Sequence, residues 1–186
     1  MRFVGPKVGK YRTILLDPPW PERGGGRIKR GADRHYPLMS LKEIADLPIE
    51  SLADLEGCHI YLWITNNYVP AAIRIFEERW NITYITMITW GKEKIGLGQY
   101  FRGRTEHALF GRIGMLPYKT LSNGKRAQGD TLITAPRGRH SRKPTELHEA
   151  AELVSYEPRI ELFARDRREG WDIWGNEVNS DIQLEE

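Results

Sequence analysis

The stretch that most constrains this chain is a short apolar run that stops at two consecutive prolines. Residues 14–16 are Ile-Leu-Leu, the side chains of a buried strand, and the run ends at Asp17. Pro18 and Pro19 follow, and because proline has no backbone N–H they cannot continue a strand ladder. The sequence therefore predicts a strand that ends at Asp17, then a stiff turn that presents an acid and an aromatic residue, Trp20.

Apolar runs of strand length alternate with helical segments along the rest of the chain. Further strands are expected at residues 59–65, 82–90, 106–112, 159–164 and 171–174. Helices are expected to begin at the capping box Ser40-Leu-Lys-Glu43, at Asn66 or Asn67, and at Pro144, with Leu38, Leu41 and Ile44 in the core. The alternation predicts an α/β fold with a mostly parallel sheet and helices on both faces. Ligands bind such sheets at the carboxyl ends of strands, where Asp17 and Arg165 both lie.

The length of 186 residues suits one domain, 1–186, with a single substantial core. Stretches 21–35, 91–104 and 113–143 are rich in glycine and bases and are expected to be mobile basic loops. The acidic tail, 178–186, is expected to fray. Basic loops suit contact with nucleic-acid phosphates, although plain solvated loops would have the same composition. The basic residues expected to bind the substrate are Arg23, Arg27, Lys29, Arg30 and Arg104.

Several classes of protein are disfavoured by what the sequence lacks. The single cysteine, Cys58, excludes a disulfide framework and a multi-cysteine zinc site, and the five histidines are scattered, so no metal is expected. No apolar stretch is long enough for a membrane span and no signal peptide is seen, which predicts a cytoplasmic protein without a membrane partner. Neither a dinucleotide fingerprint nor a P-loop occurs. Monomer and homodimer are both left open.

The turn after the first strand suits methylation of an exocyclic amino group on a nucleobase. Such a nitrogen shares its lone pair with the ring and is a poor nucleophile, so its hydrogens must be bound while the lone pair faces the methyl donor. The Asp17 carboxylate and the Pro18 carbonyl are both acceptors, and Trp20 offers an aromatic face to a flipped base. The two prolines would fix these acceptors before substrate arrives. An ordinary strand-to-turn junction is the alternative interpretation.

The chain as a whole resembles the adenine-N(6) methyltransferase family with permuted motifs, the family of the messenger-RNA adenosine methyltransferase catalytic subunit. The matching segments, spread from about Tyr11 to Glu177, are Asp17-Pro-Pro-Trp20, Tyr36-Pro-Leu-Met-Ser40, Leu62-Trp-Ile-Thr65, Trp90-Gly-Lys92, Gly103-Arg-Thr-Glu-His107, Ser141-Arg-Lys-Pro144, Ile160-Glu-Leu-Phe-Ala-Arg165 and Gly175-Asn176. Glu177, where the messenger-RNA enzyme has an amide, fits the bacterial and phage DNA-modifying branch better.

This resemblance implies a Rossmann-like methyltransferase fold, with S-adenosylmethionine as donor and adenine in DNA as substrate. It implies a catalytic segment of Asp17, Pro18, Pro19 and Trp20, with Trp20 stacking on or walling the adenine and Tyr36 lining the substrate pocket. It also implies that Lys143, Phe163, Arg165, Asn176 and Glu177 hold the cofactor. Phe163 could instead be a core residue only.

Three alternatives stand beside this prediction. The same reaction on adenosine in RNA is the nearest, and the absence of an appended RNA-binding domain favours DNA. The chain could also be a non-catalytic nucleic-acid-binding subunit, which the intact Asp17-Pro-Pro-Trp20 segment argues against. Methylation of a protein amide uses a related tetrapeptide, but usually with asparagine in place of Asp17.

Overall fold

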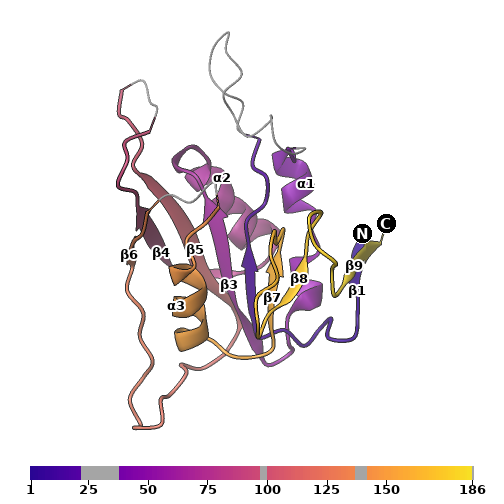
Figure 1. Ribbon diagram of the computed structural model, residues 1–186. Helices are drawn as coiled ribbons and strands as arrows, with labels where there is room; N and C mark the ends of the chain where they lie inside the picture. Colours follow the sequence, from indigo (N-terminus) through magenta and orange to yellow (C-terminus); the bar gives the residue numbers. More distant parts are fainter. Residues whose placement is uncertain (22–37, 97–99, 137–141, 186) are drawn as a thin grey trace.

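A seven-stranded sheet runs through the computed structural model, which describes residues 1–21, 38–96, 100–136 and 142–185 (Figure 1). In spatial order its strands are β6 (Leu132–Thr134), β4 (Thr83–Gly91), β5 (Thr105–Gly114), β3 (Gly57–Ile64), β2 (Thr13–Leu16), β7 (Arg159–Leu162) and β8 (Asp172–Trp174). Strand β5 is antiparallel to β3 and β4, and the other neighbours pair in parallel. The mostly parallel sheet predicted from the sequence is confirmed.

Strand β2 lies inside the sheet between β3 and β7, and all four of its residues are buried. Because successive side chains point to opposite faces, Ile14 and Leu16 belong to one core cluster and Leu15 to the other. Strand β3 is buried along its whole length, and its alternate side chains belong to the two core clusters in the same way. This explains why both strands are apolar at nearly every position, as central strands of parallel sheets are.

Helices cover both faces of the sheet (Figure 1). One face carries α1 (Leu41–Ala45), the 3-10 turn η2 (Ile49–Leu52), α2 (Val69–Arg74) and the π-helical turn η4 (Ile75–Arg79). The other face carries α3 (Glu146–Val154), which contributes Leu147 and Ala151 to the core. In the part of the chain that the structure describes, no helix is long and apolar enough to cross a membrane.

The start of α1 confirms the predicted capping box. The Glu43 backbone N–H donates to Ser40 Oγ at 3.2 Å, and the Ser40 backbone N–H donates to Glu43 Oε2 at 2.7 Å. Ile44 is buried as predicted, but the prediction for Leu41 was wrong, because it is 37% exposed. The helix is only five residues long, so its first turn lies at the surface.

The start of α2 differs from the prediction that an asparagine caps it. Asn66 and Asn67 belong to a separate 3-10 turn, η3 (Asn66–Tyr68), and Tyr68 occupies the N-cap position without a side-chain hydrogen bond. Pro70 lies in the first turn, as expected, where its missing N–H has no cost.

Two of the expected loops contain paired backbone. Residues 113–143 include β6, which pairs with the end of β4. In 91–104, the Lys92 N–H donates to the Arg104 carbonyl at 2.8 Å and the Gly96 N–H to the Gly103 carbonyl at 2.7 Å. The connection from β4 to β5 is therefore a hairpin that continues past the sheet. The expected loop at 21–35 lies almost wholly outside the described residues.

The expectation of a frayed acidic tail was wrong. Strand β9 (Gln183–Glu185) pairs antiparallel with β1 (Arg2–Val4), and Ile182 is 1% exposed. An Arg2 guanidinium nitrogen lies 3.1 Å from a Glu185 carboxylate oxygen, so the acidic tail is matched by a base at the other end of the chain.

Gly111 on β5 offers a test of how tightly the sheet packs against η4. A methyl group there would overlap the Phe76 ring of η4 and would lie 2.6 Å from the Thr83 carbonyl oxygen and 2.8 Å from Ile82 Cγ2. We expect Gly111→Ala to lower the free energy of unfolding by about 2–3 kcal/mol, as overpacking does, measured by urea denaturation. Gly91→Ala is the matched control on β4, since its nearest atom would be at 3.8 Å. Equal stability of the two variants would contradict this packing.

Candidate active site

Asp17 lies where β2 ends, and the backbone around it is held on both sides. The Asp17 N–H donates to the Leu162 carbonyl of β7 at 3.4 Å. The Pro18 carbonyl accepts from the Trp20 N–H at 2.8 Å, and the Pro19 carbonyl accepts from the Met39 N–H at 2.9 Å. The turn is therefore fixed by hydrogen bonds to its carbonyls, although its prolines donate none.

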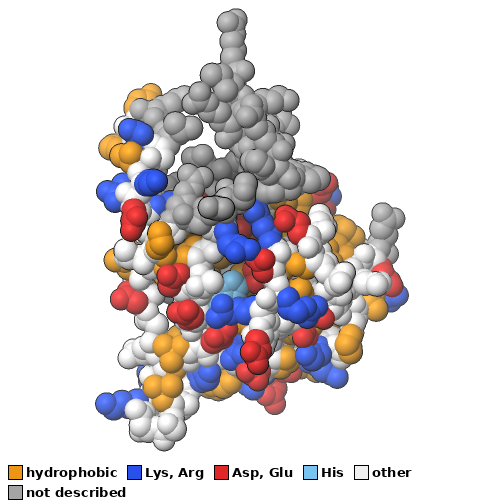
Figure 2. Space-filling model, in the orientation of Figure 1, with side chains coloured by type: hydrophobic (Ala, Val, Ile, Leu, Met, Phe, Trp, Pro, Cys, Tyr) orange, Lys and Arg blue, Asp and Glu red, His pale blue; other side chains and the backbone are white. Residues whose placement is uncertain are grey.

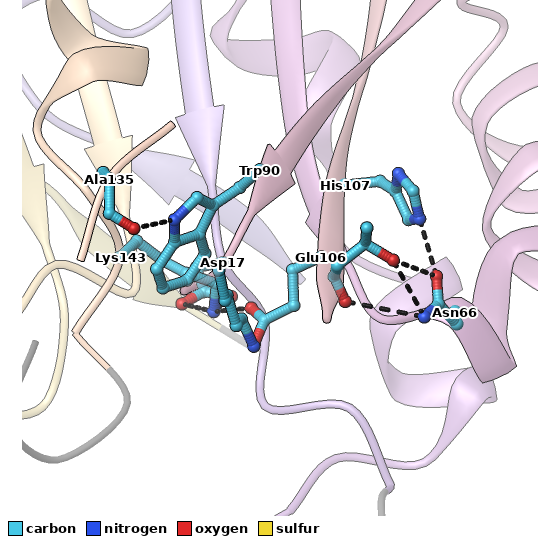
Figure 3. A network of polar contacts seen from close by, with 9 residues as sticks. Asp17, Asn66, Trp90, Glu106, His107, Ala135 and Lys143 are labelled. Carbon is cyan, nitrogen blue, oxygen red and sulfur yellow. Dashed lines mark hydrogen bonds and ion pairs between the residues drawn. The ribbon is translucent and has the colours of Figure 1, made fainter. Parts of the chain in front are cut away.

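A row of alternating charges begins at Asp17. Lys143 Nζ donates to both Asp17 carboxylate oxygens, at 2.8 and 2.7 Å, and lies 3.4 Å from Glu106 Oε2. Glu106 is paired in turn with Lys92. These four side chains, here called the charge row, are 16–20% exposed. Figure 3 shows Asp17 and Glu106 pointing toward Lys143 from different strands.

Two tryptophans form the apolar base of the charge row. Lys143 Nζ lies 5.6 Å from the ring centroid of Trp63, and Lys92 Nζ lies 4.8 Å from that of Trp90. The two rings meet edge to face at 6.2 Å, and the Trp90 indole N–H donates to the Ala135 carbonyl at 2.9 Å (Figure 3). Both lysines therefore gain cation–π attraction while their charges face carboxylates.

The two carboxyl groups of the charge row have pKa values shifted in opposite directions. Burial raises the pKa of Asp17 above its usual value, and Lys143 offsets this only in part. Burial also acts to raise the pKa of Glu106, but Lys143 and Lys92 together lower it below its usual value. Glu106 is therefore the more firmly ionised of the pair, and Asp17 is the carboxylate better suited to accept a proton.

Trp20 is buried rather than presented to a ligand. Its exposed fraction is 5%, its ring stacks on Tyr68 with centroids 5.5 Å apart, and its indole N–H donates to the Trp63 carbonyl at 2.8 Å. The Tyr68 hydroxyl donates to the Pro21 carbonyl at 2.8 Å and closes the arrangement. Of the two roles expected for Trp20, stacking on the adenine or walling it, this burial favours the wall.

A second polar cluster fixes the start of β5 beside Glu106. His107 Nε2 lies 2.6 Å from Asn66 Oδ1, and its Nδ1 lies 3.0 Å from Thr89 Oγ1. Asn66 Nδ2 donates to Thr105 Oγ1 at 3.2 Å (Figure 3). Burial lowers the pKa of His107, which favours its neutral form, and its hydrogen bonds hold the backbone from which Glu106 projects.

The residues expected to hold a cofactor gather mainly at the carboxyl ends of β7 and β8. The Ala164 N–H donates to the Trp174 carbonyl at 3.0 Å, which brings Phe163 and Arg165 beside Asn176 and Glu177. Arg165 Nε lies 3.9 Å from Glu177 Oε1. The positive charge of Arg165 also opposes the rise in the pKa of Asp17, so Arg165 lies close enough to act on the charge row.

Phe163 has an unusual backbone at this edge of the sheet. Its φ of 63° lies in the left-handed region, which is rare for an aromatic residue and is associated with functional sites. Its ring meets Trp174 edge to face at 5.1 Å. The Phe163 ring thus packs partly against the core. The backbone turn at Phe163 leads directly to Arg165.

Some predicted residues cannot be placed, and two important ones were missed. Tyr36, Arg23, Arg27, Lys29 and Arg30 lie outside the described residues. The Arg104 side chain donates to the Lys92 and Glu93 carbonyls at 3.2 Å and stiffens the β4–β5 hairpin. Glu106 and Lys92 received no role from the sequence. Their signal was a charge of each sign at the ends of two apolar strands, inside motifs that matched the family.

The comparisons with known proteins agree with this site. A family model described as MT-A70 matches residues 11–177, which include the whole charge row. The chain belongs to the MT-A70 family. This is a family of methyltransferases, and both the resemblance and the Rossmann-like fold expected from it are thereby confirmed.

In the described part of the chain, no group of three or more His, Cys, Asp or Glu side chains could hold a metal ion.

Three relatives show the range of MT-A70 proteins that this chain is similar to. Type II methyltransferase M.MunI of a Mycoplasma species is 28% identical over 91% of this chain and 78% of its own length. N6-methyladenosine RNA methyltransferase MTA1 of Cryphonectria parasitica is 30% identical over 90% of this chain, which spans 52% of that relative. Human N(6)-adenine-specific methyltransferase METTL4 is 26% identical over 90% of this chain, which spans only 37% of it.

Removing Lys143, the central cation of the charge row, should lower the free energy of unfolding by an amount that depends on pH. Lys143→Met leaves the Asp17 and Glu106 carboxylates without the lysine between them, and we expect a loss of about 3 kcal/mol at neutral pH. The folded-state pKa of Asp17 then rises further above that of the unfolded chain, and the pKa of Glu106 also rises, although Lys92 still opposes this rise. The variant therefore loses the most stability at pH values above these raised pKa values. The loss becomes smaller as the pH falls through them, because the carboxylates are then protonated. Urea denaturation at neutral pH and at about pH 5 measures it.

The matched control is Arg142→Met, at the neighbouring position. Arg142 pairs with Asp166 where both side chains are well exposed, at 63% and 58%, so its removal should change stability by less than about 1 kcal/mol at either pH. Equal stability of the Lys143 and Arg142 variants at neutral pH would show that the charge row does not need its central lysine.

Proposed function

We propose that this chain is an S-adenosylmethionine-dependent methyltransferase that modifies the exocyclic N6 amino group of adenine in DNA. The observation that carries the proposal is the Asp17 carboxylate, held at the carboxyl end of β2 by a fixed Pro-Pro turn and by Lys143. Support for the substrate comes from relatives named as a type II methyltransferase and as an N(6)-adenine-specific methyltransferase.

The site offers two acceptors for the two hydrogens of an amino group. Asp17 shares its oxygens with Lys143 but retains lone pairs, since an ionised carboxylate has about four acceptor positions. The Pro18 carbonyl accepts from the Trp20 N–H and has a second lone pair. Binding both hydrogens in the plane of the base leaves the nitrogen lone pair directed out of that plane, as methyl transfer requires.

Asp17 also suits the proton that leaves. When the amino nitrogen gains a methyl group it must lose one proton, and a carboxylate already accepting that hydrogen is the nearest base. Its raised pKa makes it a better proton acceptor than an exposed aspartate. Glu106, with its lowered pKa, stays ionised and keeps Lys143 in position.

The residues around the charge row have the chemistry needed for the proposed cofactor. S-adenosylmethionine supplies an electrophilic methyl group when bound. Its carboxylate would find cations in Lys143 and Arg165, and its ribose hydroxyls would find acceptors in Asn176 and Glu177, at the ends of β7 and β8. Phe163 and Trp174 contribute apolar surface at the same edge.

We expect Asp17→Asn to reduce methylation of an adenine-containing DNA duplex by about 10²–10³-fold, the scale of losing one preorganised polar contact at a reacting centre. Transfer of label from the methyl donor measures the rate, and calorimetric titration with S-adenosylmethionine checks that binding is retained. Asp54→Asn is the matched control, because Asp54 lies before β3 at the opposite edge of the sheet, where it accepts from the Glu56 N–H.

Retention of most activity by Asp17→Asn would contradict the proposed mechanism. Absence of any heat of S-adenosylmethionine binding by the unmodified protein would favour the non-catalytic subunit instead. RNA is the second candidate substrate, since one relative is named as an RNA methyltransferase. Matched deoxyribose and ribose oligonucleotides of one sequence, assayed side by side, distinguish the two.

A further inference from the structure

The hairpin between β4 and β5 carries two aromatic side chains that are almost fully exposed. Tyr100 is 94% exposed and Phe101 is 92% exposed, among the most exposed large apolar side chains of the described residues. Neighbouring aromatic residues at such exposure are unusual on a free surface, because each presents a large apolar area to water. A surface of this kind indicates a binding partner.

The hairpin holds these rings on a paired stalk. Backbone hydrogen bonds join Lys92 to Arg104 and Gly96 to Gly103, and the Arg102 Nε donates to the Gly96 carbonyl at 2.9 Å. The structure describes residues 92–96 and 100–104 of the hairpin. They include four basic side chains (Lys92, Lys94, Arg102, Arg104) and one acidic side chain, Glu93. The hairpin thus carries a net positive charge, which suits a polyanion better than an apolar protein surface.

The hairpin rises from the same edge of the sheet as the charge row. Lys92 at its root is a member of that row through its pair with Glu106. Figure 1 shows the hairpin extending beyond the sheet on the side where β2 ends, and Figure 2 shows hydrophobic and basic side chains together in that region. From Arg104, paired with Lys92 at the root of the hairpin, to Tyr100 is four residues, up to about 13 Å of extended chain.

We propose that Tyr100 and Phe101 form an aromatic finger that stacks on nucleobases flanking the target nucleotide. This rests on the proposed function, which it deepens by naming a substrate contact. The reach of the hairpin corresponds to about three or four base steps of 3.4 Å, so the finger contacts neighbouring bases and not the one being methylated. Aromatic stacking accepts any base, while Lys94 and Arg102 attract the phosphates on either side.

The test is the affinity of the full chain for a short adenine-containing DNA, measured by fluorescence anisotropy. We expect Tyr100→Ser or Phe101→Ser to weaken binding by about tenfold and the double variant by about a hundredfold, following the strength of base stacking. Tyr100→Trp and Phe101→Trp should retain affinity. The controls are Leu55→Ser and Met115→Ser, which remove exposed apolar side chains at the opposite edge of the sheet and should change nothing.

Salt dependence separates stacking from charge. Lys94→Gln should reduce the slope of log affinity against log salt by about one, whereas the aromatic variants should lower affinity without changing that slope. A fluorescent base, 2-aminopurine, placed beside the target adenine should be quenched by the unmodified protein and less so by the double variant.

The outcomes distinguish this inference from the proposed function. Equal DNA affinity and equal methylation by the double variant would overturn the finger and leave the methyltransferase assignment intact. Finger-dependent DNA binding with no methylation would support the finger and contradict the assignment. If the double variant instead lost self-association in sedimentation while its DNA affinity was unchanged, the aromatic pair would be a contact between two copies and the inference would be wrong.

Discussion

The site depends on one lysine placed between two buried carboxylates. Asp17 comes from the end of β2, Glu106 from the start of β5, and Lys143 from the segment before α3, so three distant parts of the sequence meet at Lys143 Nζ. Without a cation there, two carboxylates would repel each other where little water reaches them. Buried ion pairs are often no more stabilising than apolar side chains of the same volume. The retention of four charges here is therefore better explained by chemistry than by stability.

The topology of the sheet explains why the site forms at β2. After β2 the chain forms β3, β4, β5 and β6, which extend the sheet on one side of β2 in the spatial order β3, β5, β4, β6. It then returns to add β7 and β8 on the other side of β2. Strand order thus reverses at the β2–β7 boundary, the kind of position at which open α/β sheets bind ligands. Asp17 follows β2 and Arg165 follows β7, so the two residues lie on either side of this boundary. The hydrogen bond from the Asp17 N–H to Leu162 keeps the two strand ends together.

Local patterns in the sequence predicted what depends on neighbouring residues. The strand before Asp17, the capping box at Ser40 and the helix expected near Pro144 follow from strand and helix periodicity and from proline chemistry, and all three are present. Pairings between distant residues were not predictable in this way. Strand β9 is stabilised by β1 at the other end of the chain, and β6 is only three residues long and is fixed by β4. The burial of Trp20 likewise depends on Tyr68 and the Trp63 carbonyl.

The charge row also separates chemistry from substrate attraction. Its two carboxylates and two lysines cancel formally, so the reacting centre neither attracts nor repels a phosphate backbone. The whole chain carries a formal net charge of only +3, which is too little to attract nucleic acid strongly by itself. Attraction must then come from local groups outside the row, and the β4–β5 hairpin supplies Lys94, Arg102 and Arg104 beside two exposed rings. Under the proposed function, a change in these groups can alter which nucleic acid is bound without disturbing Asp17, the carboxylate proposed to act on the base.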